Sequence, residues 1–306
     1  MHETITNRAN PMIDPALHIW GWEIPVYLFL GGLAAGLMIL SAMLARRDGA
    51  PLSRWARRLP FAAPALLSLG MLALFLDLEH PAHVFRFYLA FRPASPMSWG
   101  AWILVAIYPA SLLYGLALLT DEEWAPAARA AGPFEKFRAF AVAKTGALAW
   151  INAVLGIALG AYTGVLLGNL GARAAWNSPV LAPLFLVSGF STGAALAMLL
   201  PLSPSEKHLL RRWDLAAIGV EAALLGLFLV GLSTGGAATR EAAALFLGGA
   251  FTAPFFVFVV IAGLGVPFVL EAVEWRKKLA PTLFAPALLL AGGLALRWVL
   301  VAAGQA

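Results

Sequence analysis

This 306-residue chain contains several apolar stretches that are each long enough to cross a bilayer. Acidic, imidazole, phenol and indole side chains gather at the ends of these stretches. Glu23 opens the first stretch, and Asp77 and His80 close the second. An ionisable group at membrane depth is costly unless it is paired or functional, so these three residues are candidates for proton transfer. Other side chains at the same ends that can form hydrogen bonds are Trp22, Tyr27, Trp99, Tyr162 and Asn177.

This set of side chains suits the head group of a quinone. The carbonyl oxygens of a quinone need hydrogen-bond donors, its reduction takes up protons, and its isoprenoid tail needs access from lipid. We expect Tyr27 or Tyr162 to donate to a carbonyl oxygen. We expect Glu23, Asp77 or His80 to pass protons, with pKa values set by burial and by neighbouring charges.

The same residue types also fit two other interpretations. Tryptophans such as Trp99 and Trp176 are typical of an aromatic belt at the membrane interface, and Asn177 is a suitable helix cap. A transporter vestibule would use similar side chains, so a small-molecule or ion transporter is the alternative function. A transporter predicts an occluded site near the bilayer midplane, between broken helices.

Eight apolar stretches must position these residues. A hydrocarbon core of roughly 30 Å needs about 20 apolar residues in a helix. With 61% hydrophobic and 12% charged residues, the sequence predicts one all-α integral membrane domain over residues 1–306. Residues 1–20 are expected to form a short tail and not a cleavable signal, because they lack the order of basic and then apolar residues typical of one. The predicted spans are residues 24–45, 60–78, 99–119, 143–167, 180–200, 215–232, 244–270 and 283–301.

Basic residues predict the orientation of these spans. The connections after the odd-numbered spans hold 15 of the 21 lysines and arginines, and loops rich in these residues stay in the cytoplasm. Both termini are therefore expected on the periplasmic side of a bacterial inner membrane. The remaining arginines, including Arg297, are assigned to the outer face. The inner loops also explain the net charge of +5, which makes nucleic-acid binding a poor interpretation.

The sequence contains no cysteine, so the protein cannot ligate an iron–sulfur cluster by itself. Intrinsic haem is not expected either, because the five histidines lie in tails, loops or span ends rather than as pairs inside helices. Any redox cofactor is expected to be mobile or to belong to a partner.

Glycines spaced four apart, such as Gly32 and Gly36, predict helix faces that pack closely.

Several distinctive segments follow one another along the sequence. They are 22–36 (WEIPVYLFLGGLAAG), 77–81 (DLEHP), 95–102 (SPMSWGAW), 162–167 (YTGVLL), 176–179 (WNSP), 188–193 (SGFSTG) and 265–271 (GVPFVLE). In this order they resemble the NrfD family, the family of the polysulfide reductase membrane subunit. The resemblance runs from about residue 20 to residue 200 and continues more loosely near the seventh span.

The resemblance implies eight helices in two four-helix bundles and a pocket for menaquinone or ubiquinone near the periplasmic face. It also implies a ferredoxin-like iron–sulfur partner and a molybdopterin catalytic subunit. Tyr27 matches a quinone-contacting histidine of the family, and Tyr162 matches a quinone-contacting tyrosine. Ile24 stands where the family offers an asparagine, which makes Glu23 a candidate substitute for that residue. The motif of Asp77 more often has Gly-Arg where this sequence has Glu-His.

Two further acids lie inside the predicted spans. Glu221 is near the inner part of the sixth span, and Glu271 is near the inner end of the seventh. Intramembrane acids often carry protons, so both are candidates for a proton path to the quinone site. Alternatively, Glu271 pairs with Lys277 or Lys278 at the interface.

Overall fold

The computed structural model describes residues 20–47, 51–78, 80–89, 91–128, 134–277 and 282–306. Every regular element in these ranges is helical, as the predicted all-α class requires. Eight helices are long and apolar enough to cross a membrane, which confirms the eight predicted spans. They are α1 (Glu23–Ala45), α2 (Arg54–Leu76), α4 (Pro96–Leu118), α7 (Thr145–Gly168), α8 (Leu181–Leu199), α9 (Pro204–Thr234), the pair η2 (Pro254–Gly265) and α11 (Val266–Arg276), and α12 (Phe284–Gln305).

The start of α9 differs most from its predicted position, residue 215. Ser203 and Glu206 form a capping box, in which each side chain accepts from the other's backbone N–H. Glu206 also accepts from the backbone N–H of Ser53, which fixes this end against the loop before α2. The helix therefore begins well before its apolar stretch, and its first turns carry polar residues.

The seventh span begins later than its predicted start at residue 244. Residues there form a separate helix, α10 (Ala237–Phe246), and the backbone then turns at Gly248 with φ 121°. A positive φ of this size suits glycine because it has no Cβ. The span itself starts as the π-helix η2, a wide helical form often found at functional sites.

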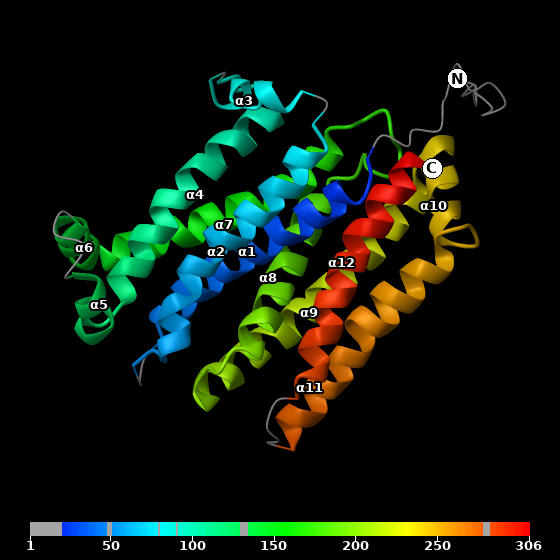
Figure 1. The fold of residues 1–306 in the computed structure, drawn as a ribbon. Helices are drawn as coiled ribbons and strands as arrows, with labels where there is room; N and C mark the ends of the chain where they lie inside the picture. Colours follow the sequence, from blue (N-terminus) through cyan, green and yellow to red (C-terminus); the bar gives the residue numbers. More distant parts are fainter. Residues whose placement is uncertain (1–19, 48–50, 79, 90, 129–133, 278–281) are drawn as a thin grey trace.

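Short helices cover the ends of the spans. α3 (Arg86–Leu89) and α10 lie at the end of the molecule that also holds the start of α1 and the end of α12, whereas α5 (Asp121–Ala128) and α6 (Phe134–Ala143) lie at the opposite end (Figure 1). The first end corresponds to the predicted outer side, and it is called the outer end below. Its placement outside the cytoplasm stays a prediction.

Helix packing follows the small residues. A Cβ on Gly36 of α1 would collide with the backbone of Gly189 in α8, and one on Gly193 would lie 2.8 Å from Cα of Gly36. This close crossing confirms the packing face predicted from the glycines. Helices α1, α2, α4 and α7 contact one another, as do α8, α9, α12 and the η2–α11 span, while α1 also packs tightly on α8. The division into two separate four-helix bundles stays a prediction.

The described beginning and the end of the protein meet at the outer end. The Trp20 backbone N–H donates to Oε1 of Gln305 at 2.8 Å, and Nε2 of Gln305 donates to the Trp20 carbonyl at 3.0 Å. The ring of Trp176 stacks on Trp20 with centroids 5.0 Å apart, and its Nε1 donates to the Leu300 carbonyl at 2.7 Å. The rest of the predicted tail at 1–20 lies outside the described residues.

Candidate functional site

Two buried phenols from different helices lie near each other at the outer end. Tyr27 in α1 is 4% exposed and Tyr162 in α7 is 7% exposed. The ring of Tyr162 occupies the space that a Cβ on Gly100 of α4 would fill, and Tyr27 packs beside Gly70 of α2. Tyr27 lies within electrostatic range of Tyr162 and of Tyr88. Four spans thus bring the two predicted tyrosines into one region.

The two predicted acids at this end also come together. Glu23 lies in the first turn of α1, and Asp77 follows the last residue of α2. Burial raises the pKa of Asp77, and the negative charge of Glu23 raises it further. A carboxyl group with a raised pKa stays protonated at higher pH, so Asp77 is suited to donate a proton.

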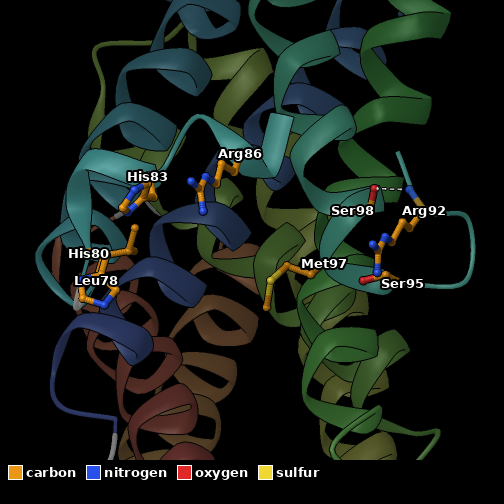
Figure 2. Close-up of a pocket in the computed structure, with 8 residues that line it drawn as sticks. All are labelled: Leu78, His80, His83, Arg86, Arg92, Ser95, Met97 and Ser98. Carbon is orange, nitrogen blue, oxygen red and sulfur yellow. Dashed lines mark hydrogen bonds between the residues drawn. The ribbon is translucent and has the colours of Figure 1, made fainter. Parts of the chain in front are cut away.

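The remaining predicted acid–base residue, His80, lines a cavity of about 490 Å³ together with Leu78, which directly follows Asp77. The two tyrosines and the two acids are not part of its lining. Figure 2 shows Met97 reaching into the space between the His83–Arg86 segment and the residues that lead into α4. Within the lining, Oγ of Ser98 accepts from the Arg92 backbone N–H at 3.0 Å. The cavity is lined by Leu78, His80, His83, Arg86, Arg92, Ser95, Met97 and Ser98.

Sequence reasoning missed the basic part of this lining. His83, Arg86 and Arg92 all lie in the connection between the second and third spans. That connection carries two arginines on a side otherwise poor in basic residues, and this excess is a signal in the sequence. Its fold into η1 (Pro81–His83) and α3, which brings the basic residues to one cavity, has no such signal.

The predicted indoles and Asn177 lie towards the surface. Trp22 and Trp99 are about half exposed, and Nε1 of Trp99 donates to the Pro93 carbonyl at 2.6 Å. Asn177 is exposed, and its backbone N–H donates to the Arg173 carbonyl. Within the described ranges, no hydrogen bond joins these three side chains to the buried tyrosines. Their position suits an interfacial belt, and their contact with a ligand stays a prediction.

A second polar group, which we call the buried charge cluster, lies between α8, α9, α11 and α12. Fully buried Arg297 donates from Nη1 to Oγ of Ser188 at 2.6 Å and to the Gly293 carbonyl at 2.9 Å. Nearer the inner end, Arg211 and Glu274 form an ion pair at 3.2 Å. The acids of the cluster are Asp214, Glu221, Glu271 and Glu274, all buried.

Sequence reasoning found Glu221 and Glu271 of this cluster and missed Asp214 and Arg297. Asp214 precedes the predicted start of the sixth span, in a segment expected to form a loop. The assignment of Arg297 to the outer face is wrong, because this residue is buried inside α12. A charged residue within an apolar stretch is the signal that points to it.

The structure also bears on the alternative interpretation of Glu271. Lys277 is exposed, and no described residue provides a hydrogen-bond donor to either carboxyl oxygen of Glu271. Pairing with Lys277 is therefore wrong, while Lys278 lies outside the described residues. Glu274 is the acid that forms polar contacts at this level, with Arg211 and with the Thr282 hydroxyl at 2.7 Å.

Eight apolar helices around buried ionisable groups define a multi-span helical membrane protein. The family model "Polysulphide reductase, NrfD" matches residues 9–306, and the chain belongs to this NrfD family, as its motifs predicted.

Curated relatives match along most of their length. Protein NrfD of Escherichia coli K12 is 32% identical over 308 residues, which cover 94% of this sequence and 95% of the relative. The C subunit of polysulfide reductase from Wolinella succinogenes is 32% identical over 310 residues, 94% of each sequence. The Protein NrfD homolog of Haemophilus influenzae is 28% identical and covers 85% of this sequence and 84% of its own.

Proposed function

We propose that this protein is the membrane subunit of a respiratory oxidoreductase and binds quinone or quinol at its outer end. The convergence of Tyr27, Tyr162, Glu23 and Asp77 from three spans carries the proposal. The donor set fits a quinone: phenols supply hydrogen bonds to carbonyl oxygens, and carboxyls supply protons. The cavity lined by His80 and by Leu78, the residue after Asp77, offers room close to Asp77.

Each side chain has a role in this proposal. Menaquinone or ubiquinone supplies two-electron, two-proton redox chemistry when it is bound. Tyr27 and Tyr162 donate hydrogen bonds and, because they are buried, exclude water from the site. Asp77, whose pKa is raised by burial and by the charge of Glu23, delivers a proton, and His80 supplies Asp77 with a new proton from the outer surface. Trp22, Trp99 and Asn177 border the entrance at the membrane interface.

The electrons require partners. Since the sequence has no cysteine, we assign the iron–sulfur clusters to a ferredoxin-like subunit that docks on the outer end. One relative is named as a single component of polysulfide reductase, that is, as part of a larger enzyme. A molybdopterin subunit would catalyse the other half-reaction. We place the complex in a bacterial inner membrane, with the N-terminus outside.

Protons can also reach the quinone site from within the membrane. Glu221 and Glu271 are buried in α9 and α11, between the inner end and Arg297. With α9 starting at Pro204, Glu221 lies about 26 Å along the helix at about 1.5 Å per residue, beyond the polar first turns. Its burial within the apolar part of α9 supports its place in a proton path.

Two substitutions test the quinone site. Tyr162→Phe removes a donor and Asp77→Asn removes a proton carrier, so each should slow quinone turnover at least tenfold, about 1.4 kcal/mol of barrier. The assay is quinol oxidation by the complex purified from its native membrane. The matched controls are Tyr114→Phe, a buried tyrosine near the other end of α4, and Asp121→Asn, whose side chain is 94% exposed. Unchanged rates in both site variants would reject the assignment.

One observation favours the alternative, a small-molecule or ion transporter. The buried charge cluster lies inside the bundle beside a π-helical span, as an occluded site would. A transporter should act as an isolated protein. Purification in mild detergent separates the two functions, because an oxidoreductase subunit should bring a cluster-bearing partner with it, and a transporter should not.

A further inference from the structure

Two carboxyl groups of the buried charge cluster approach each other from different helices. Asp214 of α9 is 0% exposed and Glu271 of α11 is 1% exposed. Oγ of Ser191 in α8 donates to Oδ1 of Asp214 at 2.6 Å. The other Asp214 oxygen and both Glu271 oxygens have no hydrogen-bond partner among the described residues. Buried polar atoms are nearly always partnered, so these three oxygens require an explanation.

The explanation lies in what the two groups can do to each other. Their carboxyls are close enough for a hydrogen bond between them. Two ionised carboxylates can only accept hydrogen bonds, so this contact forms only when one of them carries a proton. With one proton present, the carboxyl O–H of one residue donates to a carboxylate oxygen of the other, so two of the three unpartnered oxygens gain a partner.

The surrounding charges point to the same state. Arg211 faces Glu271, but it also forms the ion pair with Glu274. Deeper in the bundle, Glu221 lies within electrostatic range of Asp214 and of Arg297. Within the described part of the cluster, the three carboxyls near the inner end thus share one guanidinium. Two uncompensated negative charges away from water are very costly.

We propose that Asp214 and Glu271 bind one proton between them and form a proton-storage site in the inner half of the membrane. Ser191 holds Asp214 in place through its hydroxyl. Ser191 also lines a small internal space together with Ser188, Thr192 and Glu221. Glu221 therefore lies across this space from Ser191, and Ser188 on the same lining accepts a hydrogen bond from Arg297.

Transfer of this proton towards the quinone rests on the proton path proposed above, whereas the bound proton does not depend on quinone. A sodium ion is the other cation that two carboxylates attract. The proton is favoured because, among the described residues, no group of three or more carboxylate or imidazole side chains could hold a metal ion.

Infrared difference spectroscopy tests the site in the full-length protein reconstituted in lipid nanodiscs. Wild type at neutral pH should show the C=O stretch of a protonated carboxyl that shifts in D₂O. Asp214→Asn should abolish this band, since the amide donates to Glu271 and replaces the proton. The double variant Asp214→Asn/Glu271→Gln should lack it as well. A band of full intensity in both variants, or no such band in wild type, would overturn the proposal.

Controls separate the site from folding and from other functions. Asp121→Asn removes an exposed carboxyl and should leave the band unchanged. Both substitutions in the pair are neutral and similar in shape, so the thermal midpoint should not fall. Stabilisation of wild type by sodium chloride but not by potassium chloride would indicate a sodium site and would reject the shared proton. The band should persist in Tyr162→Phe, so a failure of the quinone assignment would leave this result intact.

Discussion

Asp77 links stability and chemistry at the level of a single residue. Burial and the charge of Glu23 raise its pKa from the ordinary value of 3.8. The folded protein therefore binds this proton more tightly than the unfolded protein. Its contribution to stability is present in full below pH 3.8 and is lost as the pH rises through the raised pKa. A proton donor is thus retained at a cost in stability near neutral pH.

The first prediction concerns Asp77→Asn. The neutral amide removes the unfavourable charge, so the thermal midpoint at neutral pH should rise by a few degrees, while quinone turnover falls. Thermal unfolding of wild type and variant between pH 4 and pH 8 measures the effect. The difference should shrink towards low pH, where Asp77 is protonated in both the folded and the unfolded protein. A constant difference across this range would contradict the raised pKa.

Residue types at the outer end were predictable, whereas the buried charge cluster was predictable only in part, since Glu221 and Glu271 were found but Asp214 and Arg297 were not. Glu23, Asp77, Tyr27 and Tyr162 stand at the ends of apolar stretches, and helix geometry alone brings such ends to one level. The burial of Arg297 depends on neighbours from other helices, because Ser188 and Phe185 of α8 supply hydrogen-bond acceptors and Gly32 of α1 leaves it room. No local pattern in α12 encodes those partners.

At the level of helices, glycines determine how closely α1 and α8 can approach each other. Gly36→Ala places a methyl group against the backbone of Gly189, which cannot move without shifting a helix. We expect a loss of about 1–3 kcal/mol of stability, as for other overpacked interiors. Unfolding in a mixed-micelle denaturant series measures it. Gly219→Ala in α9 is the matched control, because nothing lies within 4 Å of its added Cβ, and equal losses in both would contradict the packing argument.

A second prediction at this scale concerns Glu123, which joins α5 to α2. Its Oε2 accepts from Nε of Arg57 at 2.8 Å, and this hydrogen bond holds its pKa at about 2. The stabilising contribution is present above the ordinary value of 4.5 and is lost as the pH falls from there to about 2. Glu123→Gln should remove this acid-sensitive part. Acid unfolding followed by circular dichroism should show a steeper loss in wild type than in the variant.

The membrane spans could be predicted from the sequence, but the residues at which their helices begin and end were harder to predict. Hydropathy finds the membrane-crossing part, whereas the start of α9 depends on a capping box in polar sequence. The break between α10 and η2 depends on Gly248, one of 29 glycines in the sequence. The π-helical form of η2 likewise has no local signal that apolar periodicity could detect.

At the scale of the whole molecule, the orientation in the membrane is directly testable. The sequence has no cysteine, so a single introduced thiol reports only on its own position. Leu89 in α3 and Glu122 in α5 are exposed at opposite ends (Figure 1). In intact spheroplasts, a membrane-impermeant maleimide should label Leu89→Cys and should reach Glu122→Cys only after permeabilisation. The reverse pattern would place both termini in the cytoplasm.

The contact between Trp20 and Gln305 constrains the order in which the fold is completed. The ribosome makes α12 after the other seven spans, so Trp20 can gain this partner only once those spans have been made. The indole of Trp176 likewise needs the Leu300 carbonyl of α12. Until α12 is in place, the outer end of α1 lacks these contacts. A nascent polypeptide that stops short of α12 therefore exposes an unfinished outer surface to membrane proteases.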